Sequence, residues 1–124
     1  MNKKIKKQWV NALRSGKYSR GVGQLRDEED NFCCLGVLCN LHAKANPEIA
    51  KNQTDTDYYL GAQGLLPLAV AEWAGFQLSE LVISDDEIIV CDVKTRPNGP
   101  TLSQMNDHWD GSFNKIADVI EAFL

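Results

Sequence analysis

The sequence has no long hydrophobic run and no recognisable export signal. Its longest apolar stretches are far too short to cross a bilayer, which excludes a membrane-spanning helix. The lysine-rich start, MNKKIKKQWVNALRSG, lacks the apolar core of a signal peptide, so we expect a cytoplasmic protein without a membrane partner. In that compartment the four cysteines are expected to stay reduced.

Familiar signatures of catalysis are also missing. The sequence contains no nucleophile elbow, no paired-carboxylate signature, no His-Glu-x-x-His motif and no convincing Ser-His-Asp order. The GVG stretch at residues 21–23 lacks the third glycine and the preceding strand of a dinucleotide fingerprint, and no P-loop is present. These absences favour a binding protein over an enzyme without excluding an enzyme, and they predict no cofactor.

Acidic residues are absent from the first 26 positions. That segment contains eight basic residues, whereas residues 27–124 contain five basic and seventeen acidic ones, for a net charge of −4. Such asymmetry suggests an anionic partner for the N-terminal segment, or docking of one end of the molecule on the other. The plainer interpretation is a solvated lysine-rich helix beside an acidic surface. DNA binding is not expected, because the chain is acidic overall and its basic part is short.

The spacing of apolar residues predicts a small α+β fold. With 124 residues, the chain is about the size of one domain, and we expect a single domain over residues 1–124. The fold should be mainly helical with a short antiparallel sheet or hairpin, and Asn31 is a candidate cap for the second helix. The predicted elements are helices at 3–15, 32–45, 66–74 and 113–124, the last capped by Ser112, a short helical turn at 101–106, and a hairpin of strands 81–83 and 88–93.

The stretch FCCLGVLC, residues 32–39, contains three of the four cysteines, and His42 follows it. Zinc usually takes spaced pairs of ligands, whereas adjacent cysteines on a helix point about 100° apart and chelate poorly. Free cysteine packs like a small hydrophobe, so we interpret the stretch as a buried helix and expect His42 to be partly exposed. The alternative is a metal site formed by Cys33, Cys34, Cys39 and His42.

Two stretches are specific enough to suggest a family. WVNALRSGKY, residues 9–18, and FCCLGVLC resemble a family of small uncharacterised proteins found in phages and bacteria. Weaker matches at Leu66-Pro67, at Trp73-Ala74-Gly75 and at Asn106-Asp107 extend the resemblance over most of the chain. The resemblance implies a phage or mobile-element setting in the host cytoplasm, where small proteins often interfere with host machinery.

The segment RSGKYSRGVGQLR, residues 14–26, is the best candidate binding site. Arginine offers a planar fork suited to phosphate, glycine N–H groups can approach an anion, and tyrosine can stack on a base or sugar. The predicted ligand-binding residues are Arg14, Lys17, Tyr18, Arg20, Gly21, Gly23 and Arg26. The plainer interpretation is a β-hairpin with basic side chains facing solvent.

These residues predict a small phage-type accessory protein that binds and sequesters an anionic, nucleotide-like small molecule without catalysis. Such a protein would act as a sponge for a host immune signal. One alternative is a protein–protein inhibitor of a host factor, acting through the acidic surface around Asp85 and Asp86 and an exposed loop at Tyr58-Tyr59. The apolar helix at 32–41 leaves a homo-oligomer open.

Another alternative is a small hydrolase or nuclease that uses Asp107 and His108. The stretch Asn106-Asp107-His108-Trp109-Asp110 places an imidazole between two carboxylates, a combination that can transfer protons or hold a metal. Adjacent residues rarely converge on one atom, however. The plainer interpretation is a loop with a helix cap and an anchoring tryptophan.

Overall fold

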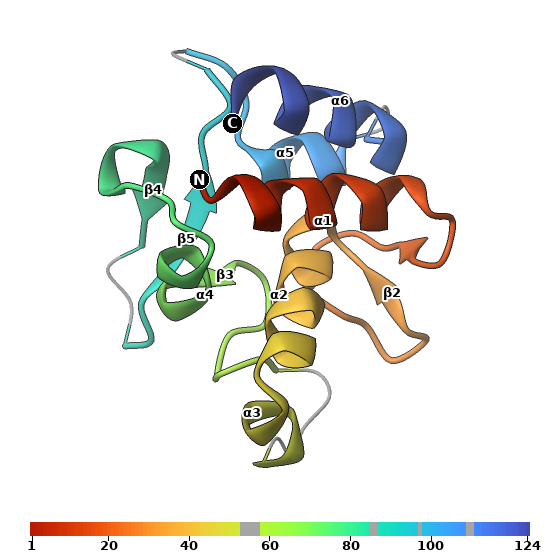
Figure 1. Ribbon diagram of the computed structural model, residues 1–124, viewed down its shortest axis with the longest axis vertical. Helices are drawn as coiled ribbons and strands as arrows, with labels where there is room; N and C mark the ends of the chain where they lie inside the picture. The colour runs from red at the N-terminus through yellow and green to blue at the C-terminus, as the bar shows by residue number, and fades with distance from the viewer. Residues whose placement is uncertain (53–57, 85–86, 97, 109–110) are drawn as a thin grey trace.

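The computed structural model describes residues 1–52, 58–84, 87–96, 98–108 and 111–124, and Figure 1 shows how the elements are arranged. In chain order these are α1 (Lys3–Arg14), β1 (Ser19–Arg20), β2 (Asn31–Phe32), α2 (Cys34–Ala45), α3 (Pro47–Asn52), β3 (Leu66–Pro67), α4 (Leu68–Trp73), the 3-10 helix η1 (Leu78–Glu80), β4 (Leu81–Ile83), β5 (Val90–Val93), α5 (Leu102–Asp107) and α6 (Phe113–Phe123). The predicted α+β class is confirmed. Asp85, Asp86, Trp109 and Asp110, which belong to the alternative sites, lie outside the described residues.

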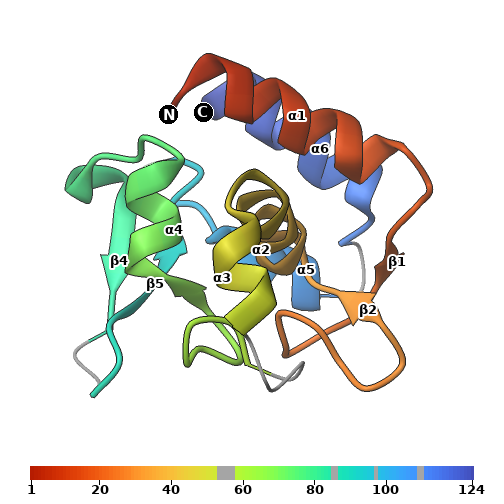
Figure 2. The same cartoon turned by 60° about the horizontal axis from the view of Figure 1, so that its bottom comes forward.

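α1 and α6 lie side by side and form one wall of the core, as Figures 1 and 2 both show. The predicted inner face of α1 is confirmed, because Trp9 and Leu13 are buried. α6 buries Ile116 and Ile120 at the predicted helical spacing, and the Ser112 hydroxyl caps its first turn as expected. Both helices are therefore specified by a local pattern of one apolar face and one polar face.

α2 runs through the middle of the molecule, between the α1–α6 pair and the sheet (Figure 2). It is buried on almost every side, as the FCCLGVLC pattern predicts. The prediction of its cap was wrong: the helix starts at Cys34, and the Cys33 thiol caps it by accepting the Gly36 N–H at 3.3 Å. Asn31 lies in β2 instead, where its backbone and side-chain N–H groups donate to the Asp27 carboxylate.

The antiparallel sheet has the strand order β3-β5-β4, with Leu66 opposite Cys91 and Leu81 opposite Val93. The predicted hairpin is confirmed, although its second strand begins at Val90. β3 was not predicted, because its Pro67 suggested the start of a helix. Proline is compatible with an edge strand, where its missing N–H removes no ladder bond, and α4 follows directly.

The basic segment after α1 folds back through a short parallel pair. Ser19 of β1 lies opposite Asn31 of β2, and Arg20 opposite Phe32. The residues between these strands return through a single antiparallel bridge between Arg26 and Phe32. The segment is therefore a loop whose two ends both pair with β2. It is not the simple β-hairpin considered from the sequence, because β1 and β2 run parallel.

Candidate functional site

Two arginines of the predicted site form ion pairs within the molecule. Arg14, at the end of α1, donates from Nη2 to the Asp118 carboxylate at 2.6 Å and to the Glu121 carboxylate at 3.0 Å, both on α6. The hydrogen bonds to Glu121 and Asp118 raise the pKa of Arg14. Arg26 pairs in the same way with Asp30, with Nη2 at 2.7 Å from the carboxylate. Each guanidinium already has an acidic partner.

Arg20, Gly21 and Gly23 are held against the end of α5. Arg20 donates from Nη1 to the Asn106 carbonyl at 2.5 Å, and the Asn106 side chain donates to the Gly21 carbonyl at 2.8 Å. The Gly23 N–H donates to the Asp107 carboxylate at 3.0 Å, while the Gly21 N–H donates to a carbonyl of β2 at 2.8 Å. The two glycine N–H groups proposed for an anion therefore have acceptors in the protein.

Tyr18 and Lys17 differ in how far they are engaged. The Tyr18 hydroxyl donates to the Asn40 side chain at 3.0 Å, and its ring meets Phe32 edge-on with centroids 5.1 Å apart. The Lys44 ammonium lies 5.8 Å from the centroid of the Tyr18 ring. The Lys17 side chain is exposed and has no ion pair with any described residue. Ligand binding along residues 14–26 stays a prediction, and a ligand there would have to displace most of these contacts.

The Asp107–His108 alternative gains no dyad from the described contacts. The Asp107 carboxylate accepts from the Asn106 side chain at 3.0 Å, in addition to the backbone contact described above. His108 is exposed, and no hydrogen bond among the described residues joins its imidazole to the Asp107 carboxylate. Asp107 therefore acts here as a structural acceptor, and catalysis at this position stays a prediction.

The cysteines lie in the core, as the sequence predicted. Their side chains are buried, and burial raises the pKa of Cys33 and of Cys91 to about 11. It also raises the pKa values of Cys34 and Cys39. Within the described ranges, no group of three or more His, Cys, Asp or Glu side chains is placed to hold a metal ion. The buried thiols pack in the core, and the Cys33 thiol also caps α2.

The prediction that His42 is partly exposed was wrong. α2 has almost no exposed face, so the His42 ring is buried edge-on to Trp73 with centroids 5.0 Å apart, and burial lowers its pKa. Its Nδ1 lies 2.6 Å from the Tyr59 hydroxyl, and Tyr59 is buried as well. Of the proposed Tyr58-Tyr59 contact surface, Tyr58 is the exposed member.

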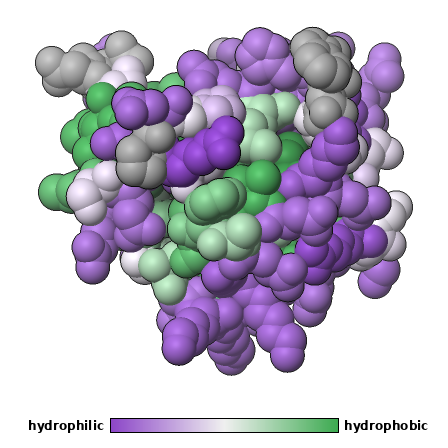
Figure 3. All heavy atoms as spheres, turned by 90° about the horizontal axis from the view of Figure 1, so that it is seen from above, coloured by the Kyte–Doolittle hydropathy of each residue, from purple (hydrophilic) through white to green (hydrophobic). Residues whose placement is uncertain are grey.

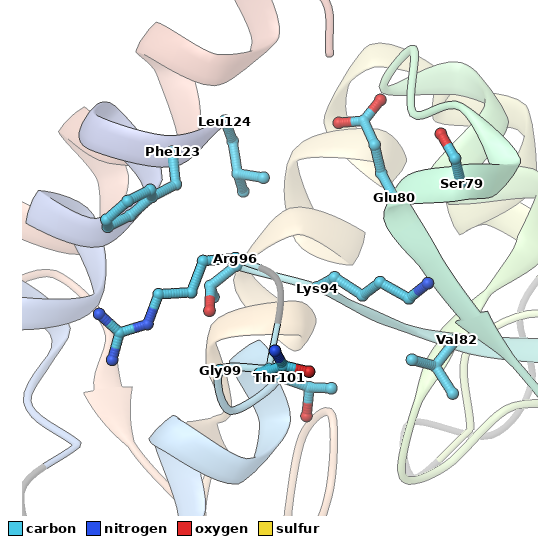
Figure 4. Close-up of a pocket in the computed structure, with 11 residues that line it drawn as sticks. Ser79, Glu80, Val82, Lys94, Arg96, Gly99, Thr101, Phe123 and Leu124 are labelled. Carbon is cyan, nitrogen blue, oxygen red and sulfur yellow. The ribbon is translucent and has the colours of Figure 1, made fainter.

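A groove that the sequence did not indicate lies at one end of the sheet. It is bounded by η1 and β4, by the loop of residues 94–101, and by the end of α6, and its volume is about 490 Å³ (Figure 4). Figure 3 views this end of the molecule, where areas of hydrophobic atoms lie between hydrophilic ones. The lining side chains that could contact a ligand are Glu80, Val82, Lys94, Arg96, Thr101 and Phe123.

The loop that forms the middle of the groove is fastened at its base. Lys94 and Thr101 form an antiparallel bridge. Asp92, buried on β5, accepts from the Thr101 hydroxyl at 2.7 Å, from the Ser103 N–H at 3.1 Å and from the Ser103 hydroxyl. These bonds tie the start of α5 to β5. The described ends of the loop, at Lys94 and Thr101, are therefore held against each other and against β5.

Gly99 lies close to the stem of the Arg96 side chain. The Gly99 N–H donates to the Arg96 carbonyl at 3.1 Å, and a Cβ at Gly99 would lie 2.5 Å from Arg96 Cγ. The bare backbone of Gly99 thus leaves room for the stem of the Arg96 side chain. In Figure 4 the Arg96 side chain points toward the Phe123 end of the groove, and that of Lys94 points toward Val82.

The groove combines positive charge with an acceptor and an aromatic ring. Neither Lys94 nor Arg96 forms an ion pair with another described residue. On the opposite wall, one Glu80 carboxylate oxygen accepts the Gln77 N–H at 3.0 Å. The Phe123 ring is 52% exposed. The groove can therefore receive an anionic group, a hydrogen-bond donor and a flat ring together.

From the sequence alone, the stretch KTRPNGP, residues 94–100, indicates only a loop that connects β5 to α5. One feature of the sequence could have indicated a binding site here. Residues 27–124 contain only five basic residues, and two of them, Lys94 and Arg96, are separated by a single residue beside a turn. Nothing in the local sequence places Glu80 or Phe123 next to them. Those two residues reach the groove through the sheet and through the packing of α6.

Among the described helices, none is both long enough and apolar enough to cross a membrane.

Comparison with known proteins places the chain in a family. No curated protein matches the chain, and no solved structure matches it either. A family model does match, over residues 1–124, and its description is Domain of unknown function (DUF8296). The chain therefore belongs to the DUF8296 family.

Proposed function

We propose that this protein binds an anionic, nucleotide-like small molecule in the groove between β4, the 94–101 loop and the end of α6. The observation that carries the proposal is the pair Lys94 and Arg96, which line a groove of about 490 Å³ and have no intramolecular ion pair among the described residues. Pockets of this volume suit small molecules and cofactors. Two unpaired cations in one groove favour a ligand that brings negative charge.

The other walls of the groove fit the remaining parts of a nucleotide. Because the two cations point toward opposite ends of the groove, the Arg96 fork and the Lys94 ammonium would each donate to a different anionic group of the ligand, each hydrogen bond worth about 1.5–3 kcal/mol because the donors are charged. A base can stack on the exposed Phe123 ring. An exocyclic amine or a sugar hydroxyl can donate to Glu80, whose carboxylate has one oxygen beyond the contact with Gln77.

We propose that the protein holds this ligand rather than converting it. The Thr101 hydroxyl donates to the buried Asp92 carboxylate at 2.7 Å, and the Thr95 hydroxyl donates to the Pro100 carbonyl at 2.7 Å, so both serve the loop. No histidine lines the described part of the groove. Sequestration of a nucleotide-derived host signal, in a phage-type setting, is the use that the sequence resemblance supports.

The same class of ligand could instead bind along residues 14–26. Variants separate the two locations, because Lys94→Ala and Arg96→Ala remove the cations of the groove, whereas Arg14→Ala and Lys17→Ala remove cations of the N-terminal segment. The groove is favoured because its cations have no ion pair with a described residue, while Arg14 already contacts Asp118 and Glu121.

Calorimetric titration with a panel of nucleotides and cyclic nucleotides tests the proposal, with native mass spectrometry of the same mixtures. We expect at least one member to bind, and expect Lys94→Ala or Arg96→Ala to weaken binding about 10- to 100-fold, the equivalent of losing one charged hydrogen bond. Arg14→Ala should leave the affinity within about twofold. Binding that is unchanged in the Lys94 and Arg96 variants would contradict the proposed location, and no binding across the panel would contradict the ligand class.

A further inference from the structure

The outer edge of β4 has unpaired backbone groups. β4 is an edge strand, because the sheet order is β3-β5-β4. The Lys94 N–H donates to the Glu80 carbonyl and the Ser84 N–H donates to the Val90 carbonyl, both at 2.9 Å. Because bonded and non-bonded pairs alternate in an antiparallel ladder, the N–H and C=O of Ile83, between these bonds, point away from β5. Neither group has a hydrogen-bond partner in the described part of the chain.

This edge is short, with three residues, but it carries none of the residues that usually protect an exposed strand. Edge strands are commonly blunted by lysine, proline or a bulge, and β4 reads Leu-Val-Ile without any of them. Val82 is 47% exposed and Ile83 is 44% exposed. On the other arm of the hairpin Ile88 and Ile89 are also exposed. Figure 1 shows β4 and β5 at one side of the molecule. Apolar side chains and free backbone groups therefore occur together.

The charge of the hairpin decides which partner would fit. Residues 77–93 contain five acidic residues and no basic residue, and Lys94 follows them. Of the described acidic residues in this stretch, Glu80 and Glu87 are not buried, whereas Asp92 is. A second copy of the chain would bring the same negative charge to the same edge, which is unfavourable. A segment that alternates basic and apolar residues would complement both the charge and the exposed side chains.

We infer that the β4 edge accepts an extended, basic peptide segment of a protein partner as an added strand of the sheet. The partner's main chain would donate to and accept from Ile83. Because successive strand residues face opposite sides, its apolar side chains would cover Ile83 on one face, and its lysines or arginines would lie on the other face, on the side of Val82 and Glu80. Strand addition of this kind takes affinity from main-chain hydrogen bonds and specificity from alternate side chains. Glu80 and Val82 also line the groove, so the peptide is tested without nucleotide, and its binding does not require one.

Two heptapeptides provide the test: one alternates lysine with valine, and the other alternates glutamate with valine. Binding of each fluorescent peptide to the full chain is measured by anisotropy, and hydrogen exchange of the Ile83 amide is followed by NMR. Ile83→Pro removes an N–H that β5 does not use, and proline is tolerated on an edge strand. Ile83→Lys keeps the backbone and adds repulsion, and Val22→Lys makes the same change at an exposed apolar residue outside the edge.

We expect the lysine peptide to bind at least tenfold more tightly than the glutamate peptide and to slow exchange of the Ile83 amide. Ile83→Pro and Ile83→Lys should each weaken binding at least tenfold, while Val22→Lys should leave it unchanged. Three results would overturn the inference: no binding of the lysine peptide, equal affinity for both peptides, or concentration-dependent dimers that bury the edge. If Ile83→Pro fails to fold, Ile83→Lys and the exchange measurement decide alone.

Discussion

Asn106 joins three parts of the molecule through one buried side chain. Its Oδ1 accepts the Cys34 N–H at 2.9 Å, at the first turn of α2, and its Nδ2 donates to the Gly21 carbonyl and to the Asp107 carboxylate. The side chain is completely buried, so water cannot replace these bonds if they are lost. An amide at this position therefore links α5 to both the central helix and the basic segment.

Replacing this amide should be costly. We expect Asn106→Ala to lower the free energy of unfolding by about 3 kcal/mol, because it leaves the buried Cys34 N–H and the partly buried Gly21 carbonyl without this partner. Urea denaturation of the variant and the wild-type protein measures the effect. Asn11→Ala, at an exposed position of α1, is the matched control and should not destabilise the protein. A loss below about 1 kcal/mol in Asn106→Ala would contradict the role given to this residue.

His42 should make stability depend on pH. Burial lowers its pKa below the ordinary value of 6.5, so the unfolded chain binds the proton more readily than the folded one. The contribution of neutral His42 is therefore complete above pH 6.5 and is lost as pH falls from 6.5 through the folded pKa. Urea denaturation at pH 7.5 and at pH 5.5 should show lower stability at the acidic value.

The source of that dependence can be assigned by substitution. His42→Gln removes the titrating ring, so the difference in stability between the two pH values should shrink. His108→Gln changes a histidine with an exposed side chain and should leave the difference as in the wild type. Equal pH dependence in His42→Gln and wild-type protein would show that the buried ring is not its cause.

At the scale of elements, α2 depends on a glycine for a close approach rather than for a turn. A Cβ at Gly36 would overlap the Leu25 carbonyl oxygen, so the loop before β2 can touch the helix only where there is no side chain. This contact explains why FCCLGVLC carries a glycine in the middle of a buried helix. Small residues in this stretch let another segment pack directly against the backbone.

Gly36→Ala should therefore destabilise the protein even though alanine favours helices. Helix propensity alone predicts a gain of about 1 kcal/mol, whereas overlap with Leu25 predicts a loss of about 2 kcal/mol or more. Thermal unfolding measures which effect is larger. Gly64→Ala is a suitable control, because a Cβ there would meet the Gly23 carbonyl oxygen only at 3.5 Å, an ordinary contact. A higher melting temperature for Gly36→Ala would contradict the packing seen here.

The elements differ in how far the sequence predicts them. α1 and α6 carry a regular apolar face, so local spacing was sufficient, and the β4–β5 hairpin followed from two short apolar runs around an acidic turn. β3 and the parallel β1–β2 pair have two residues per strand. Strands that short are created by their partners, and no local period predicts them. The Cys33 cap was missed because a thiol is an unusual capping group.

At the scale of the whole molecule, all four cysteines belong to one core. Their burial raises the pKa of each thiol, and the thiolate is the reactive form. We expect native protein to react very slowly with iodoacetamide at pH 8, and unfolded protein to take up four labels, as counted by mass spectrometry. Rapid labelling of even one cysteine under native conditions would contradict the core described here.

The charge asymmetry of the chain is partly resolved by folding. Arg14 pairs with Asp118 and Glu121, so the basic and acidic parts of the sequence meet across the α1–α6 contact. Docking of one end on the other was one of the interpretations that the sequence left open. The candidate groove could not be predicted in the same way, because Glu80, Lys94 and Phe123 come together only in the folded molecule.

The most direct test of the account maps the ligand site by NMR. Amide spectra of the labelled protein are recorded while the tightest-binding nucleotide of the panel is added. We predict shifts concentrated at residues 79–82, 94–101 and 123–124, and their loss in the Lys94→Ala, Arg96→Ala double variant. Shifts concentrated at residues 14–26, with the double variant still binding, would contradict the groove as the binding site and return the ligand to the N-terminal segment.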